Sequence, residues 1–456
     1  MIIKRLAFYK SPIETMGLQN SWILFFLIKI IENPRQSSLF SFYFKGLNRY
    51  SFFRLTGRFF YSLVCGVVWK IIRRLGQTKK KLHLFTLKDF VKNKEIEKTG
   101  LIKASIVKTI APHFISSGKI AFKKSDYPSE RFPEIYVATI REATVIGGSN
   151  LSIVNNEIIC HDLFAISTDL TAEERHCRIN YNGNVFRLTY KIMTKKYSKL
   201  TEAASFVDAL SSNYAHWMTE VLPRIVSFCS NNKYKNVSII IDDKLHKNIM
   251  TTLEKVVGRR RVYLLPMNHI VKIDKLYATS VAGYISYERR YKFIQPSSEG
   301  KFNANAMRLV VSLLRPLNDK RQTPQKIYLR RNSGYRNLTN QNEIEALLTR
   351  HRFTIVEPEK LSFLEQVTYF SKAKVIIGPT GASFANLIFC NKKVNLAILV
   401  NNDKNMICKF WVNLASIMGI QVNYITGKSK QFSGGIHRDF SVDFNLIDAY
   451  LKSITR

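Results

Sequence analysis

Short apolar runs alternate with amphipathic stretches through the C-terminal half of the chain. The apolar runs predict three strands: KIYL (326–329), FTIV (353–356) and KVII (374–377). Helices are predicted between them, one over Glu343–Arg350 and one from the S-x-x-E capping box at Ser362 to about Lys372. Strands that alternate with helices over short connections indicate a parallel sheet covered on both faces.

The middle of the chain has a different pattern. Residues 100–200 contain short β-branched runs, such as Ile135–Ile140 and Ala143–Ile146, which are separated by turn-forming residues. From about residue 205, further strand runs at 237–241 and 262–265 follow helical patterns. A polar stretch with prolines and one helix, Ala304–Leu314, predicts a boundary near 300–322. We therefore expect three parts: a basic segment (1–90), an N-terminal α/β domain (91–310) and a C-terminal α/β domain (311–456).

Charge and aromatic residues are concentrated at the start of the chain. The whole sequence has 70 Lys and Arg against 33 Asp and Glu, a formal net charge of +37. Within residues 1–81 only Glu14 and Glu32 oppose many cations, and aromatic side chains crowd residues 40–69. Aromatic and basic side chains together are typical of helices that bind an anionic membrane surface. Packing against the protein body and nucleic-acid contact are the alternatives, and the second lacks a recognised motif.

Composition excludes several other classes of protein. Hydrophobic residues make up 46% of the chain, which excludes a mostly disordered protein. The apolar run Trp22–Ile28 ends at Lys29 and is too short for a membrane span. No signal-peptide cleavage pattern follows it, and the six cysteines are scattered without a C-x-x-C pair. We expect a reduced, cytoplasmic protein without a structural zinc site.

The stretch SSNYAHWMTEVLPR (211–224) is the first candidate for chemistry. If Ser211 or Ser212 caps a helix, His216 and Glu220 lie four residues apart on one face. A carboxylate beside an imidazole fixes its tautomer and raises its basicity, as a general base requires. The alternative is that His216 is a core residue and Glu220 pairs with Arg224. One His and one Glu are too few ligands for a metal site.

Two loops that follow predicted strands are candidates for binding an anion. Arg331 and Arg336 lie in the loop after KIYL, where a doubly wound sheet binds ligands, and two arginines can clamp a diphosphate. The turn GPTGAS (378–383) follows KVII, and free amides at a helix start favour phosphate or sugar oxygens. Either loop alone is also compatible with a solvated surface.

Taken together, four motifs in this order resemble glycosyltransferase family 61. They are NYAHWMTEVLPR, then YLRRNSGYR with NQNE, then LSFLEQV, then GPTGASFANLIF. The resemblance covers about residues 205–400. It implies a GT-B fold, in which two Rossmann-like domains face each other across a cleft, and inverting, metal-independent transfer from a nucleotide-sugar. No cofactor or metal is expected.

The resemblance also implies roles for individual residues. His216 matches the histidine of the family's N-terminal motif. We expect His216 to be the general base, with Glu220 orienting it, and Asp208 to be the reserve base. The expected donor-binding residues are Arg331, Arg336, Asn340, Glu343, Glu365, Gln366, Gly378, Thr380, Gly381, Ala382 and Ser383. Thr380 departs from the family, which usually has His before Gly-Ala; a hydroxyl can still hydrogen-bond a phosphate or sugar.

We therefore expect an inverting glycosyltransferase of bacterial capsule or lipopolysaccharide synthesis. Its partners would be a nucleotide-sugar donor, a glycan or lipid-linked acceptor, and an anionic membrane surface bound through residues 1–81, with no nucleic acid. This places it on the inner face of the cell membrane as a peripheral protein. The alternative, which Thr380 motivates, is a non-catalytic, membrane-associated assembly protein with a degenerate glycosyltransferase domain.

Overall fold

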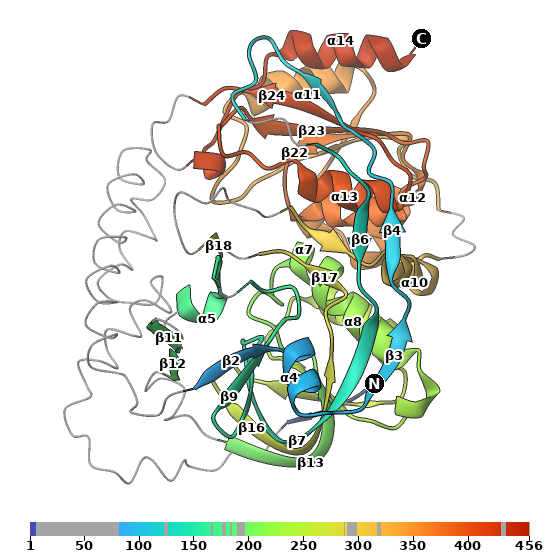
Figure 1. Ribbon diagram of the computed structural model, residues 1–456. Helices are drawn as coiled ribbons and strands as arrows, with labels where there is room; N and C mark the ends of the chain where they lie inside the picture. Colours follow the sequence, from blue (N-terminus) through green and yellow to red (C-terminus); the bar gives the residue numbers. More distant parts are fainter. Residues whose placement is uncertain are drawn as a thin grey trace, which may run out of the picture.

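Two β-sheets, each with its own helices, make up most of the described protein (Figure 1). The computed structural model describes residues 1–5, 82–122, 126–165, 167–175, 179–182, 185–188, 197–286, 288–289, 299–316, 321–429 and 435–455. Most of the basic, aromatic segment predicted over residues 1–81 lies outside these residues. Its membrane-binding role therefore stays a prediction.

The first sheet combines parallel and antiparallel strands. Its order is β1 (Ile2–Arg5), β15 (Arg261–Leu265), β14 (Ile239–Asp242), β13 (Tyr197–Ser205), β16 (Ile270–Thr279), β7 (Ile135–Ile146), β8 (Ser152–Val154), β9 (Glu157–Cys160) and β2 (His83–Thr86). The neighbouring strands from β1 to β16 pair in parallel, and the pairs β16–β7, β7–β8 and β8–β9 are antiparallel. Strand β3 (Lys98–Ile102) also pairs antiparallel with β7. The two runs predicted within 135–146 form one continuous strand, β7.

Both ends of the predicted 1–90 segment belong to this sheet. Ile2 pairs with Arg261, so β1 is the edge strand beside β15. At the other edge β2 pairs in parallel with β9, and α4 (Leu87–Asn93) follows it with Phe90 and Val91 buried. The described ends of this segment are therefore part of the folded body.

The second sheet is parallel throughout and has six strands. Its order is β21 (Thr354–Val356), β20 (Lys326–Leu329), β22 (Val375–Pro379), β23 (Asn395–Asn401), β24 (Val422–Gly427) and β5 (His113–Ile115). The three strands predicted from the KIYL, FTIV and KVII runs are confirmed. The chain leaves β20 toward β21 on one side and returns to β22 on the other, so the strand order reverses at β20.

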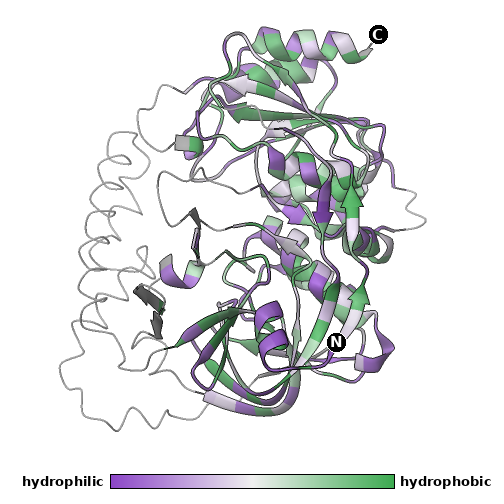
Figure 2. Ribbon diagram, in the orientation of Figure 1, coloured by the Kyte–Doolittle hydropathy of each residue, from purple (hydrophilic) through white to green (hydrophobic). Residues whose placement is uncertain are grey.

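Alternating side chains cover both faces of the second sheet, as predicted. Tyr328 and Ile377 face α11 (Gln341–Arg350) and α14 (Phe444–Thr455). Ile327 and Ile376 face the opposite layer, which contains α12 (Phe363–Lys372), the 3-10 helix η6 (Ala382–Phe389) and α13 (Lys409–Ile417). Figure 2 shows hydrophobic positions along the strands, whereas α14 carries both polar and hydrophobic positions.

One segment of the predicted N-terminal domain crosses to the second sheet. After β3 the chain passes through β4 (Ser105–Val107), adds β5 to the edge of the second sheet, and returns through β6 (Glu130–Phe132) to β7. Strands β4 and β6 pair antiparallel between the two sheets (Figure 1). Residues 91–310 are therefore not confined to the first sheet.

Three helices that precede β20 join the main hydrophobic core. We call the chain before β20 the first half and the chain from β20 onward the second half. Helix α10 (Ala304–Leu314), which has the predicted bounds, packs on α8 (Leu222–Cys229) and α9 (Lys247–Val257). Residues of these helices and of α12, α13 and η6 form one continuous buried cluster. The two halves are thus held together by apolar burial as well as by β5.

The remaining described elements are short. They are α5 (Ala172–Arg175), the pair β10 (Asp169–Leu170) and β18 (Glu288–Arg289), the pair β11 (Ile179–Asn182) and β12 (Val185–Leu188), the pair β17 (Gly283–Tyr284) and β19 (Lys301–Phe302), and the 3-10 turns η4 (Asn232–Tyr234), η5 (Pro358–Lys360) and η7 (Gly435–His437). Within the described ranges, no helix is both long enough and apolar enough to span a bilayer. Cys160, Cys229, Cys390 and Cys408 are free thiols.

Candidate functional site

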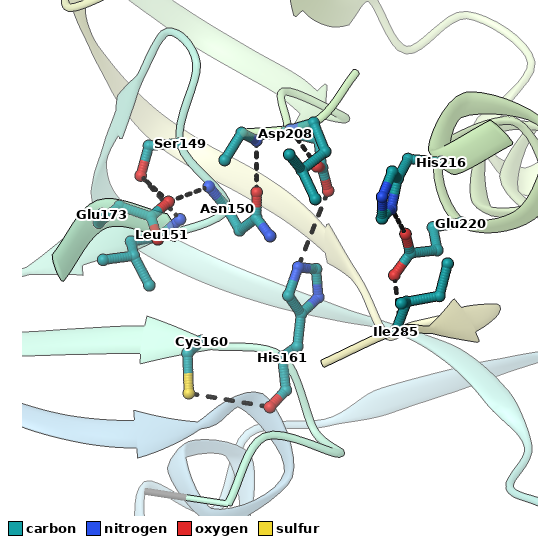
Figure 3. Close-up of polar contacts among 12 residues, drawn as sticks. Ser149, Asn150, Leu151, Cys160, His161, Glu173, Asp208, His216, Glu220 and Ile285 are labelled. Atoms are coloured by element: carbon teal, nitrogen blue, oxygen red, sulfur yellow. Dashed lines mark hydrogen bonds and ion pairs between the residues drawn. The ribbon is translucent and has the colours of Figure 1, made fainter. Parts of the chain in front are cut away.

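His216 and Glu220 form a hydrogen-bonded pair, as the sequence predicts. His216 Nδ1 contacts Glu220 Oε2, and the other carboxylate oxygen accepts a hydrogen bond of 2.9 Å from the backbone N–H of Ile285 (Figure 3). Burial acts to lower the pKa of His216, but the charges of Glu220 and Asp208 and the hydrogen bond to Glu220 outweigh it. The pKa of His216 is therefore raised, and its ring is oriented by a carboxylate.

The helix that carries this pair is short and irregular. Asn213, rather than Ser211 or Ser212, caps it by accepting from the Ala215 amide, and α7 spans only Tyr214–His216. A π-helical turn, η3 (Trp217–Val221), follows before α8 begins. π-Helical turns are rare and are frequent at functional sites. The turn is anchored by Trp217, whose buried indole donates to Thr252 at 2.8 Å.

Asp208 lies at the end of β13, close to this pair. Its backbone N–H donates to Asp242 at 2.8 Å, and its own carboxylate accepts from the Leu210 amide at 2.9 Å. Burial, followed by the charge of Glu220, raises the pKa of Asp208 to about 7. Asp208 can therefore hold or release a proton near neutral pH, as a base must.

Two groups that the sequence analysis did not select complete this cluster. His161 Nε2 lies 3.8 Å from Asp208 Oδ2, and burial lowers the pKa of His161 to about 3, with Arg224 adding to the effect (Figure 3). Burial also lowers the pKa of Arg224, while Asp208, Glu220 and Asp162 oppose it. The cluster thus combines carboxylates, an imidazole whose pKa is raised and a buried guanidinium in one small volume.

A second site lies where the strand order reverses in the second sheet. A cavity of about 390 Å³ opens between β20 and β22 at their carboxyl ends, where doubly wound sheets bind ligands. Its walls come from both halves of the chain: Ser212, Tyr214, His246, Asn248, Ile249, Leu329, Arg330, Arg331, Asn332, Ser333, Pro358, Glu359, Gln366, Pro379, Ala382 and Ser383. This volume lies in the range of small-molecule sites.

Among the residues that the structure describes, Arg331 lines this cavity without an ion-pair partner, although the charges of Glu359 and Asp439 act on it from farther away. Its Nε donates to the Tyr335 carbonyl at 3.1 Å, and no carboxylate among the described residues lies within ion-pair distance of it. Burial and then the charge of Arg336 lower the pKa of Arg331 to about 10. By contrast, the adjacent Arg330 is held by Glu345, with Nε to Oε1 at 2.7 Å, and by Glu357 at 3.3 Å.

Arg336 lies beside Arg331 in the same loop. Both guanidinium groups lie over the ring of Tyr335, at 5.7 Å for Arg331 and 5.2 Å for Arg336, and His437 packs edge-on against that ring. The backbone of Arg336 is left-handed (φ 61°), and its buried Nε lacks a hydrogen-bond partner. Burial, together with the two arginines, lowers the pKa of His437. The loop therefore concentrates positive charge with little compensation.

The glycine turn fits against Arg331. A Cβ atom on Gly381 would lie 2.2 Å from Nη1 of Arg331, so the absence of a side chain here lets the guanidinium approach the turn closely. A Cβ atom on Gly378 would lie 2.8 Å from Cβ of Leu329, so this glycine allows β20 and β22 to pack closely. Ala382 and Ser383, which follow the turn, line the cavity. Of the predicted donor-binding residues, Arg331, Gln366, Ala382 and Ser383 thus line one cavity, with Gly381 against Arg331.

Seven of the eleven predicted donor-binding residues are not in the cavity walls: Arg336, Gly378 and Gly381, described above, and Asn340, Glu343, Glu365 and Thr380. The Thr380 hydroxyl is buried and accepts from the Trp411 indole at 3.0 Å. Asn340 does not cap α11 with its side chain but bonds Glu343 and the Val442 carbonyl, both at 2.8 Å. Glu365 completes the predicted capping box with Ser362. These side chains hydrogen-bond to other parts of the fold, so they stabilise the surroundings of the cavity without lining it.

Several residues of the two candidate sites lie outside the sequence motifs. His246, Asn248 and Glu359 line the cavity although they lie between the motifs. His161 reaches Asp208 from the end of β9, more than 40 residues earlier in the chain. Only tertiary folding brings these groups together. In the described part of the chain, no group of three His, Cys, Asp or Glu is arranged to hold a metal ion.

Comparison with models of known protein families gives a match to part of the chain. The family model Glycosyltransferase 61 matches residues 214–397, which begin at α7 and end in β23. The matched range therefore contains the His216–Glu220 pair, the arginine loop and the glycine turn. No curated protein matches the chain.

The raised pKa of His216 predicts a pH-dependent effect of removing its partner. Replacing Glu220 with glutamine removes the largest contribution that raises this pKa, so the pKa should fall. A raised histidine pKa stabilises the fold below its ordinary value of about 6.5 and loses that contribution as pH rises through the raised value. The destabilisation in Glu220→Gln should therefore be largest below about pH 6.5.

Two measurements check this. Histidine ¹³Cε1 NMR, assigned with His216→Gln, should give a lower pKa for His216 in Glu220→Gln than in the wild type. Urea unfolding at several pH values should show the matching loss of stability. Glu254→Gln, an exposed change in α9, is the control. An unchanged His216 pKa in Glu220→Gln would contradict the assigned pairing.

Proposed function

We propose that the protein moves a sugar from a nucleotide-sugar to a glycan or lipid-linked acceptor with inversion. The match of residues 214–397 to the family model Glycosyltransferase 61 supports glycosyltransferase activity. The observation that carries this proposal is Arg331. It is a partly buried guanidinium without a carboxylate partner, at the carboxyl end of β20 and in a cavity of about 390 Å³. Such a group favours an anionic ligand, and a nucleoside diphosphate is the anion that a sugar donor carries.

The donor diphosphate would lie between the two loops of the second sheet. Arg331 would bind its oxygens, with Arg336 nearby adding positive charge. The backbone amides after Gly381 begin η6 and add donors that favour a phosphate oxygen. Negative charge that develops on the departing diphosphate would thus meet fixed N–H groups in a site with little water. Each such N–H group typically stabilises a transition state by roughly 3–4 kcal/mol.

The transfer itself would need one base. His216, oriented by Glu220, would take the proton from the acceptor hydroxyl while the acceptor oxygen bonds to the anomeric carbon. The bond from that carbon to the diphosphate oxygen breaks at the same time, and the electron pair leaves with the nucleoside diphosphate. Attack opposite to the leaving group inverts the anomeric centre. Asp208, whose pKa is about 7, is the reserve base.

We propose that no metal ion or cofactor takes part. In metal-dependent transferases a divalent cation offsets the diphosphate charge, and here Arg331, Arg336 and the amides of η6 are in a position to do so. The donor arrangement also supports a GT-B organisation. The second sheet would bind the donor, the first half would bind the acceptor, and the cavity walls come from both.

We further propose that the acceptor is lipid-linked and that the enzyme works on the inner face of a bacterial cell membrane, in capsule or lipopolysaccharide synthesis. The basic, aromatic composition of residues 1–81 supports this proposal. The full chain should cosediment with vesicles that contain phosphatidylglycerol, and salt should weaken the binding. Equal recovery with neutral phosphatidylcholine vesicles would contradict membrane attraction by charge.

A non-catalytic assembly protein is the second candidate. It is favoured by Thr380, because the family usually has a histidine at this position. The Thr380 hydroxyl accepts a hydrogen bond from the Trp411 indole and does not line the cavity. The two candidates differ in whether the His216 cluster supports turnover.

Donor binding should depend on Arg331. Thermal unfolding of the full chain should shift upward with one class of nucleoside diphosphate among UDP, GDP, ADP and CDP, since a ligand of the native state stabilises it by mass action. Arg331→Ala should lose this shift. Arg350→Ala removes an exposed charge at the end of α11 and should retain it. Equal shifts in both variants would contradict the assigned diphosphate site.

Turnover should depend on His216 while donor binding does not. Release of nucleoside diphosphate from a panel of UDP-, GDP- and ADP-sugars should fall about 10²–10⁴-fold in His216→Asn, the loss typical of a missing general base. The nucleotide-induced thermal shift should remain, because His216 does not line the cavity. His83→Asn, an exposed change in β2, is the control. An unchanged release rate in His216→Asn, or no release by the wild type with any sugar, would favour the assembly protein.

A further inference from the structure

A chain of three hydrogen bonds joins the helix of His216 to the wall of the donor cavity. The Tyr214 hydroxyl donates to Asn386 Oδ1 at 2.6 Å, and Asn386 Nδ2 donates to Gln366 Oε1 at 2.7 Å. Gln366 Nε2 in turn donates to the Pro358 carbonyl at 2.8 Å. Tyr214, Gln366 and Pro358 line the cavity. We name this chain the Tyr214–Asn386–Gln366 relay.

The two amides of the relay are buried, and each both accepts and donates within it. Asn386 is 0% exposed and Gln366 is 5% exposed. Each amide accepts from the residue before it and donates to the residue after it, so the bonds run in one direction and polarise one another. Burial also raises the pKa of the Tyr214 hydroxyl, which keeps it protonated as the donor.

The short α7 needs such an anchor. His216 lies two residues after Tyr214, and a π-helical turn with less regular backbone bonding follows at once. The orientation of this segment therefore depends on contacts at its ends. Asn213 caps it, Trp217 and Glu220 tie it to the first half, and the relay is the described side-chain link from α7 to the second half, where α7 packs on η6.

We propose that Tyr214 and Asn386 are positioning residues that hold His216 in register with the bound donor, so that filling the donor cavity stabilises the segment that carries the base. This rests on the proposed function, because it takes the cavity as the donor site. A ligand that reduces the motion of Pro358 and Gln366 would strengthen the hydrogen bonds of the relay. These hydrogen bonds would in turn reduce the motion of α7 and η3. Neither residue is expected to touch the reacting atoms.

Hydrogen exchange with inorganic pyrophosphate as the probe tests this on the full chain. Pyrophosphate carries the charge of the donor without its base or sugar. In the wild type, saturating pyrophosphate should slow amide exchange across residues 214–221 by about threefold or more, a change typical of local stabilisation. In Tyr214→Phe the ring remains and the hydroxyl is lost, so this slowing should disappear at pyrophosphate concentrations that saturate the variant.

Tyr424→Phe is the matched control. Its hydroxyl is also buried and donates to a carbonyl, that of Cys408 at 2.7 Å, but it lies outside the relay. This variant should keep the slowing across residues 214–221. Asn386→Ser, which cannot span both neighbours, is the second variant; it should also lose the slowing, and it serves if Tyr214→Phe does not fold.

The outcomes separate the two claims. If pyrophosphate binds but leaves residues 214–221 unaffected in the wild type, or slows them equally in Tyr214→Phe and Asn386→Ser, the relay is refuted while the donor cavity stands. If pyrophosphate does not bind the wild type at all, the donor cavity fails and the relay fails with it. Slowing in the wild type and Tyr424→Phe, lost in the relay variants, supports the proposal.

Discussion

The side-by-side placement of the Arg331 loop and the Gly381 turn is the constraint on which the position of the proposed donor cavity depends. It exists because β20 and β22 are parallel neighbours, so both of their following loops emerge at the same edge of the sheet. Gly378 keeps the two strands close, and the missing side chain at Gly381 leaves room for Nη1 of Arg331. Since β21 lies on the other side of β20, the chain leaves an open crevice at this point rather than filling it.

The two halves of the site have opposite electrostatic character. Around His216 the first half has two carboxylates, Glu220 and Asp208, whose charges raise the pKa of His216. Burial, followed by the charge of Glu220, raises the pKa of Asp208 to about 7. The arginine loop of the second half concentrates positive charge, and burial together with the neighbouring Arg336 lowers the pKa of Arg331. This separation suits the proposed reaction, which removes a proton at one end and releases a phosphate anion at the other. Packing of α7 on η6 brings the two ends together.

The sequence predicted the second sheet well because its signals are local. KIYL, FTIV and KVII match β20, β21 and β22 to within about two residues, as expected from local patterns. The Ser362 capping box and the His216–Glu220 pair also depend only on short spacings. Such features follow from helical and strand periodicity, whatever the rest of the chain does.

Long-range features could not be predicted in this way. No local pattern shows that β5 joins the second sheet more than 200 residues before β20, or that His161 reaches Asp208. Thr380 lies within the expected glycine turn, but its hydroxyl is turned to Trp411, a partner 31 residues later in the chain. The sequence thus predicted that these loops follow β20 and β22, whereas side-chain direction within them depends on tertiary packing.

The central claim is that the cavity at the strand-order reversal binds the donor diphosphate. The most direct measurement is a crystal structure of the full chain grown with a saturating nucleoside diphosphate. The account predicts both phosphates within hydrogen-bonding distance of Arg331 and the amides of Ala382 and Ser383. A nucleotide bound elsewhere on the protein, with Arg331 free of contact to it, would contradict the account.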